Sequence, residues 1–173
     1  MIKLKDILLE SKSPDIFIPR RIEDRATRYV NDLIRNYIKN GNKGSLDLSG
    51  LRLRELPSML NGITINGYFD CSGKHDNAFG YSFGRNQLKS LKNSPKVING
   101  VFYCMSLGLE TLEGGPEYVA KDFECSYNNL TTLNGAPKFV GRDFYCNNNR
   151  VKFTEEQVRA VCDIKGRVYT IYD

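Results

Sequence analysis

Five cysteines and one histidine are the residues of this 173-residue chain best suited to metal binding, redox chemistry or acid–base catalysis. No two cysteines have the C-x-x-C spacing of zinc and redox sites, and His75 would need ligands from distant positions to form a metal site. Phosphate-binding, nucleophile-elbow and metalloprotease motifs do not occur in the sequence. We therefore expect no metal, no cofactor and no enzymatic activity.

The cysteines instead mark an internal repeat. Cys104, Cys125 and Cys146 are spaced by 21 residues, and Cys71 and Leu48 begin the pattern upstream. The same register aligns apolar residues on either side of the cysteines: Phe69, Phe102, Phe123 and Phe144 before them, and Leu88, Leu109, Leu130 and Val151 after them. A fixed period of this length predicts a solenoid, because one unit cannot bury its apolar side alone whereas stacked units bury a continuous column.

The unit Phe123-Glu-Cys125-Ser-Tyr-Asn128-Asn-Leu130-Thr-Thr-Leu133 resembles the leucine-rich-repeat pattern L-x-L-x-x-N-x-L-x-x-L. The resemblance covers about residues 44–153 and implies an α/β repeat solenoid of short parallel strands in units of about 21 residues. It also implies that an asparagine in each unit bonds backbone groups of the turn. Leu51 and Leu107 replace that asparagine in two units, so we expect the asparagine ladder to be broken there.

The stacked cysteines are expected to be buried as small apolar side chains. Neighbouring strands would bring their Cα atoms to about 4.8 Å, which permits a disulfide, but parallel Cβ vectors disfavour one. A redox switch built on these thiols is the alternative interpretation.

Four segments follow from the pattern. Residues 1–13 form a tail or targeting-like segment, 14–43 a helical N-terminal cap, 44–153 the solenoid, and 154–173 a C-terminal cap of a helix and a strand. The N-terminal helix should bury an apolar stripe: Ile22, Ala26, Tyr29, Val30, Leu33, Ile34, Tyr37 and Ile38. The C-terminal helix should bury Val158, Val161 and Cys162, and residues 167–172 should pair along the last repeat.

The opening Met1-Ile-Lys-Leu-Lys-Asp-Ile-Leu-Leu-Glu10, together with Asn-Leu-Thr-Thr-Leu-Asn-Gly-Ala-Pro at 129–137, resembles proteins of large tailed bacteriophages. The functions of that group are mostly unassigned. The resemblance places the protein in the host bacterial cytoplasm or in the virion. Leu8-Leu9-Glu10 is similar to the end of a capsid-targeting peptide, which implies cleavage after Glu10. A docking or frayed N-terminal helix is the alternative.

Side chains that alternate with the inward phenylalanines and cysteines should point onto a concave face. Three rows of five residues result, and none of the fifteen is lysine or arginine. The acidic and aromatic members are the candidate partner-binding residues: Asp47, Tyr68, Asp70, Tyr103, Asp122, Glu124, Asp143 and Tyr145. Tyrosine is enriched at interfaces, and the acids should attract a basic protein segment. In the alternative interpretation these side chains only solvate the sheet.

An insertion at 73–84 interrupts the array and carries four further candidate binding residues, His75, Phe79, Tyr81 and Phe83. Insertions in repeat proteins often lie on the binding face. The two phenylalanines could equally fold back as a small satellite core.

The function that these features favour is a protein-interaction module that binds a host or phage protein. One alternative is an internal or accessory virion protein packaged through residues 1–10. Another is a nucleic-acid binder that uses the arginine-rich helix (Arg21, Arg25, Arg28 and Arg35), although the net charge of +5 does not argue for nucleic acid. No apolar run approaches the roughly 20 residues of a membrane span, so we expect no membrane association.

Overall fold

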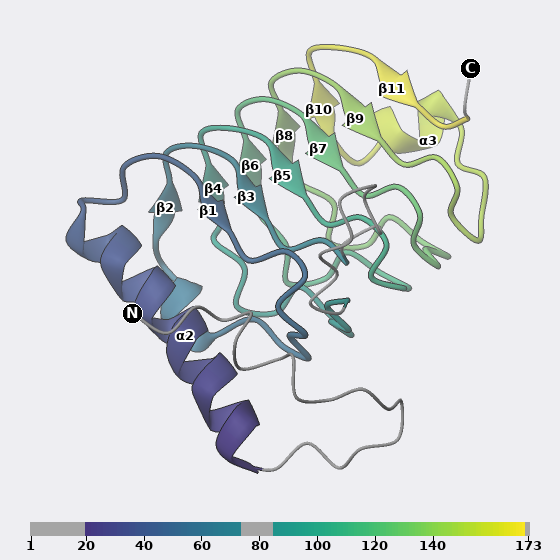
Figure 1. Cartoon of the computed structure of the whole chain (residues 1–173). Coiled ribbons are helices and arrows are strands. Elements are labelled where there is room, and N and C mark those ends of the chain that lie inside the picture. Colours follow the sequence, from purple (N-terminus) through teal and green to yellow (C-terminus); the bar gives the residue numbers. More distant parts are fainter. Residues whose placement is uncertain (1–19, 74–84, 172–173) are drawn as a thin grey trace, which may run out of the picture.

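The chain folds as a parallel β-solenoid in which each turn adds one short strand to each of two sheets (Figure 1). The computed structural model describes residues 20–73 and 85–171. The six-stranded sheet has the order β1-β3-β5-β7-β9-β11, and the five-stranded sheet has the order β10-β8-β6-β4-β2. Consecutive turns therefore lie next to each other in both sheets, as expected of a repeat solenoid.

The strands of the six-stranded sheet are two residues long. Their bounds are β1 Leu46–Asp47, β3 Phe69–Asp70, β5 Phe102–Tyr103, β7 Phe123–Glu124, β9 Phe144–Tyr145 and β11 Val168–Tyr169. All of them pair in parallel, with Phe102 opposite Phe123 and Phe123 opposite Phe144. The pairing of β11 with β9 agrees with the expected strand along the last repeat.

The five-stranded sheet was not predicted from the sequence. Its strands are β2 Thr64–Ile65, β4 Val97–Ile98, β6 Tyr118–Val119, β8 Phe139–Val140 and β10 Asp163–Ile164. Each contributes one buried aliphatic side chain to the interior and is followed, after three residues, by a strand of the six-stranded sheet. The signal in the sequence was a β-branched residue four positions before each phenylalanine. A strand of only two residues is too short to show the apolar–polar alternation by which strands are recognised.

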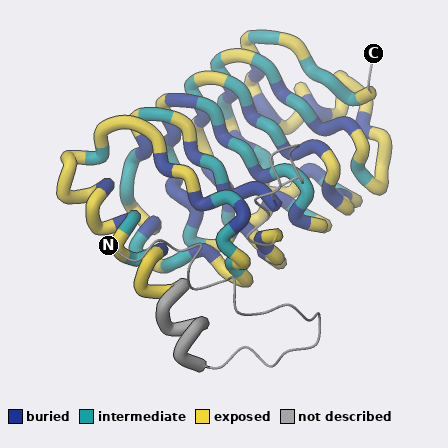
Figure 2. Tube along the Cα trace, viewed as in Figure 1, coloured by how far each residue is buried: buried dark blue, intermediate teal, exposed yellow. Residues whose placement is uncertain are grey.

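The interior is a set of stacked columns that run along the solenoid (Figure 2). Phe69, Phe102, Phe123 and Phe144 are fully buried, and the rings of Phe102 and Phe123 stack at 5.5 Å between centroids. Five buried free thiols include a column of four beside these rings: Cys71, Cys104, Cys125 and Cys146. Burial of the cysteines as small apolar groups agrees with the expectation from the sequence.

Asparagine amides join successive turns. The Asn128 side chain accepts from the N–H of Leu107 and Leu109 in the turn before and donates to the carbonyls of Cys104 and Cys125. Asn86 serves the turn of Leu51 in the same way. Leu107 supplies no amide to the turn of Asn86, so the ladder is interrupted there as expected. The backbone of the turns of Leu51 and Leu107 is still bonded, by Asn86 and Asn128 from the following turns.

Three short elements complete the described chain: helix α2 (Arg20–Lys39), the 3-10 turn η1 (Ser58–Leu60) and helix α3 (Glu155–Arg159). In α2, Val30, Ile34 and Tyr37 are buried as predicted, whereas Tyr29 and Ile38 are 41% exposed. These two residues lie at the edges of the buried stripe, where the surface of the helix begins to face away from the solenoid.

Helix α3 begins with a capping box of Thr154 and Gln157 and buries Val158, as predicted for that valine. Two inward predictions near this end were wrong: Val161 is 49% exposed and Val151 is 38% exposed. Helix α3 ends at Arg159, before its apolar stripe reaches Val161. Val151 lines the cavity at the C-terminal end of the solenoid, together with Thr170 and Ile171.

Candidate protein-binding face

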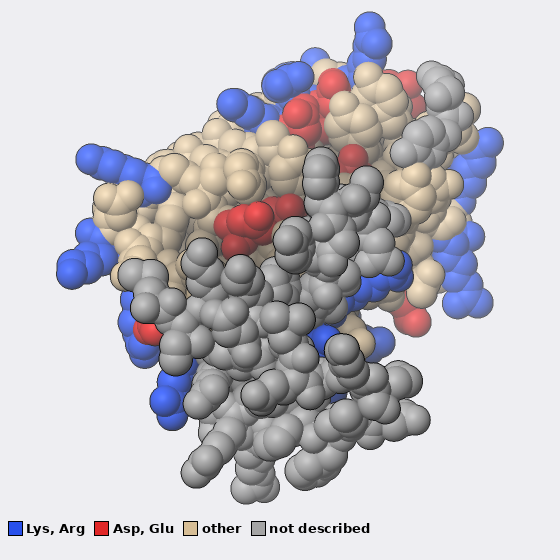
Figure 3. Space-filling model, in the orientation of Figure 1, with Lys and Arg blue, Asp and Glu red and all other residues tan. Residues whose placement is uncertain are grey.

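The outer surface of the six-stranded sheet holds the predicted partner-binding residues, and we call it the acidic–tyrosine face. Strand register places one side chain from each turn in a single row: Asp47, Asp70, Tyr103, Glu124, Tyr145 and Tyr169. The inward neighbours of the four middle residues of the row are the buried phenylalanines and cysteines, and those of Asp47 are the buried Leu46 and Leu48. Figure 3 shows acidic side chains gathered on this side of the molecule, with lysines and arginines mainly around its outline.

Three acids of the row have the same local hydrogen bond. The carboxylates of Asp47, Asp70 and Glu124 each accept the backbone N–H two residues later, from Ser49 at 2.9 Å, Ser72 at 2.8 Å and Ser126 at 3.0 Å respectively. These acids therefore help to end their strands as well as charging the face. Amide substitutions retain an acceptor oxygen and so separate the two roles, whereas charge reversal to lysine removes both.

A second acidic row lies beside the first. Asp122 Oδ1 accepts the N–H of Asp143 at 3.1 Å, and Asp143 Oδ1 accepts the N–H of Arg167 at 2.8 Å. Arg142 Nε lies 3.5 Å from Asp122. Although the predicted rows contain no basic residue, an arginine from the rim thus reaches one of their acids, and the negative charge is concentrated nearer Glu124.

The tyrosines of the face form two separate pairs. Tyr68 contacts Tyr103 edge-on with 6.2 Å between ring centroids, and Tyr145 stacks on Tyr169 at 4.5 Å with nearly parallel rings. Tyr169 was not among the predicted site residues because the repeat register could be followed only as far as Phe153. The available signal was a tyrosine at the third position of the alternating segment 167–172.

Burial and neighbouring negative charge set the proton affinities of this face. Burial is the main reason that the pKa of Glu124 is raised, and Asp122 contributes. Burial and the charges of Asp122, Asp70 and Glu124 raise the pKa of Tyr103. The pKa of Tyr145 is raised to about 12 by burial and by Asp143. The face thus carries a negative potential. No lysine or arginine neutralises Glu124, since no ion pair involves this residue within 20–73 and 85–171.

The raised pKa of Glu124 predicts a pH-dependent contribution to stability. The folded chain holds the Glu124 proton more tightly than the unfolded chain, so this contribution is fully present below the ordinary value of 4.5. It is lost as pH rises through the higher folded pKa. The free energy of unfolding of the native chain, minus that of Glu124→Gln, should therefore decrease as pH rises from 4 to 8 in urea titrations. A constant or increasing difference would contradict the assignment.

The buried thiols are poorly suited to chemistry. Burial raises the pKa of Cys71, Cys104 and Cys125 well above the ordinary value, and raises that of Cys146 to about 12. Thiolate is the reactive form, so each is held in its unreactive state. The Sγ atoms of Cys104 and Cys125 also lie 3.4 and 3.2 Å from carbonyl oxygens of the next turn, those of Glu124 and Tyr145, as weak donors.

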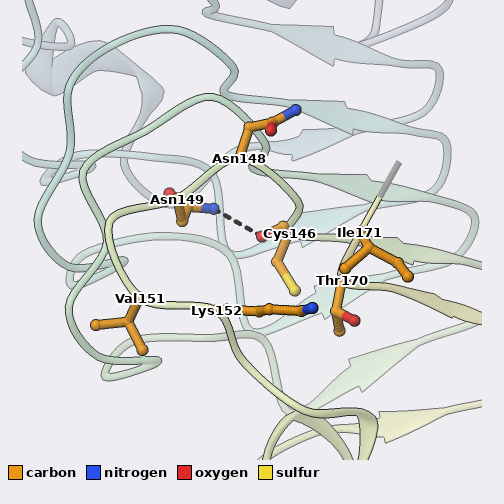
Figure 4. Close-up of a pocket in the computed structure, with 7 residues that line it drawn as sticks. All are labelled: Cys146, Asn148, Asn149, Val151, Lys152, Thr170 and Ile171. Atoms are coloured by element: carbon orange, nitrogen blue, oxygen red, sulfur yellow. Dashed lines mark hydrogen bonds between the residues drawn. The ribbon is translucent and has the colours of Figure 1, made fainter. Parts of the chain in front are cut away.

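A cavity of about 230 Å³ opens at the C-terminal end of the solenoid (Figure 4). It is lined by Cys146, Asn148, Asn149, Val151, Lys152, Thr170 and Ile171. Asn149 uses its amide to donate to the Cys146 carbonyl at 2.9 Å, so this group is committed to the fold. The lining also includes the Cys146 thiol and Lys152, but burial raises the pKa of Cys146 to about 12, so the thiol stays in its protonated, unreactive form.

Several predicted residues lie outside the described ranges: His75, Phe79, Tyr81, Phe83 and Glu10. Of the four arginines assigned to the N-terminal helix, Arg28 and Arg35 are exposed on α2, and Arg35 pairs with Asp32 at 3.2 Å. Within the described residues, no group of His, Cys, Asp and Glu side chains is placed to hold a metal ion. None of the described helices is long and apolar enough to cross a membrane.

Comparison with known proteins gives no assignment: no family model matches the chain, and neither a curated protein nor a solved structure matches it. The functional argument therefore depends on the residues and their geometry.

Proposed function

We propose that this protein is an interaction module that binds a host or phage protein through the acidic–tyrosine face. The observation that carries the proposal is the row itself: six turns place only acids and tyrosines along one line on the outer surface of the sheet, each at least partly accessible to solvent. Tyrosines offer large contact areas at low entropic cost, and acids steer a cationic partner. Solenoids commonly use such extended surfaces for binding.

The finer identity of the fold belongs to the same proposal. We infer a leucine-rich-repeat-like solenoid of about 21-residue units from a large tailed bacteriophage, with α2 and α3 closing its two ends. The asparagine bonds between turns and the burial of Val30, Ile34 and Val158 support this inference. The protein would then act in the host cytoplasm, and packaging into the virion through residues 1–10 stays the alternative.

The test is affinity capture from a bacterial lysate with the tagged native chain and the variant Asp70→Asn/Glu124→Gln/Asp143→Asn. Amides keep an acceptor oxygen for the backbone N–H groups of Ser72, Ser126 and Arg167 while removing three charges. We expect a protein that the native chain retains to bind the variant at least about tenfold more weakly, because charged pairs at an interface are commonly worth more than 1.4 kcal/mol together.

A matched control removes three charges elsewhere. Glu110, Glu113 and Glu156 are exposed and lie off the face, so their replacement by glutamine changes the net charge equally. The control variant should retain the partner. Equal binding by all three proteins would show that the face does not bind the partner. Equal loss of binding in both variants would show that only the net charge of the protein matters.

A further inference from the structure

The space above Glu124 is flanked by tyrosines on both neighbouring strands. Register places Tyr103 of β5 on one side of Glu124 and Tyr145 of β9 on the other. Strands lie about 4.8 Å apart, so the Cα atoms of the two tyrosines are separated by roughly 9.6 Å. A planar group that contacts a ring on each side needs about 7 Å, twice the ~3.5 Å of a van der Waals contact.

Each of the two rings has an aromatic neighbour on the side away from Glu124. Tyr103 contacts Tyr68, which lies on the β3 side, and Tyr145 stacks on Tyr169, which lies on the β11 side. The Glu124 carboxylate turns toward the end of its own strand and accepts the N–H of Ser126 at 3.0 Å. We call the position between Tyr103 and Tyr145, with the Glu124 carboxylate at its base, the slot.

The floor of the slot is a partly buried acid without a partner of opposite charge. Asp122 has Arg142 at 3.5 Å, whereas no ion pair in the described residues involves Glu124. A cation placed between two tyrosine rings interacts favourably with their electron-rich faces, and the carboxylate below adds a charge-assisted hydrogen bond.

We propose that the slot formed by Tyr103, Glu124 and Tyr145 receives an arginine side chain from the protein partner. This deepens the proposed function and depends on it. The guanidinium is planar, weakly hydrated and able to donate two parallel hydrogen bonds to a carboxylate while its faces stack on rings. The lysine ammonium is compact and strongly hydrated, so it uses the two walls less well.

The test uses the acetylated and amidated peptide Gly-Arg-Gly-Arg-Gly, with its lysine equivalent as the comparison. Binding to the full chain is followed by NMR titration of the tyrosine ring signals and of the Glu124 side chain. We expect the arginine peptide to bind more tightly than the lysine peptide. Glu124→Gln should weaken it about tenfold, and Tyr103→Leu or Tyr145→Leu about threefold each.

The control variant is Glu110→Gln, which removes one exposed charge that lies off the face. It should leave the arginine peptide bound as before. Equal weakening by Glu110→Gln and Glu124→Gln, or equal affinity for the lysine peptide, would overturn the arginine slot. Thermal unfolding of each variant establishes that a loss of binding is not a loss of fold.

The slot and the proposed function can fail separately. If Glu124→Gln alone retains the captured protein and the three-site amide variant does not, the slot is wrong and the binding face stands. If the three-site variant also retains the captured protein, the face itself is wrong.

Discussion

Asn128→Ala is expected to lower the free energy of unfolding by about 3–5 kcal/mol, because it removes a buried amide that bonds two turns at once. Its Oδ1 accepts the N–H groups of Leu107, Gly108 and Leu109 at 3.0–3.2 Å. Its Nδ2 donates to the carbonyls of Cys104, Cys125 and Ser126 at 2.8–3.4 Å. Alanine leaves these backbone groups without the amide, and each buried group left unpaired costs about 1–3 kcal/mol.

Urea denaturation measures the loss, with Asn129→Ala as the matched control. Asn129 is the next residue along the chain and is exposed, so its replacement should change the free energy of unfolding by less than about 0.5 kcal/mol. A loss below about 1 kcal/mol for Asn128→Ala would show that water replaces the amide at little cost. The stacking of turns would then depend on the apolar columns alone.

The inward columns could be predicted because the same residue types recur at the same position of each repeat. Phe102, Phe123 and Phe144 recur in one register with cysteine two residues later, and burial leaves few alternatives to such residues. The sequence predicted that asparagine side chains bond the backbone of the turns, but not which turn each asparagine bonds. Only the structure shows that Asn86 and Asn128 reach back into the turn before, which is why the turns of Leu51 and Leu107 are not left unbonded.

The second sheet and the details of the face escaped prediction for physical reasons. A strand of two residues has one inward side chain, so Ile98 or Val119 gives no alternation to detect. The same limit hides the Tyr118–Phe139 stack at 4.9 Å on the outer side of that sheet. On the acidic–tyrosine face, the repeat register placed the charged side chains in a row, but the pairing of the rings depends on contacts such as Tyr145–Tyr169.

Left-handed backbone positions are a further feature that recurs with the repeat. Asn93, Gly114 and Gly135 have φ of 70°, 85° and 84° and follow the last leucine of three consecutive units. At Gly135 an added Cβ would run into the backbone of Leu112 and Glu113 in the turn before. Glycine is therefore needed here for two reasons, the positive φ and the close approach of a neighbouring turn.

Gly135→Ala should consequently lower the free energy of unfolding by about 4 kcal/mol or more, because the clash is with backbone that two sheets hold in place. Gly62 separates the two causes, since it has nearly the same φ of 82° but nothing within 4 Å of an added Cβ. Gly62→Ala should cost only the left-handed strain of about 1–2 kcal/mol. Similar losses for the two variants in urea denaturation would mean that adjacent turns yield to a methyl group, and the solenoid would be looser than its spacing implies.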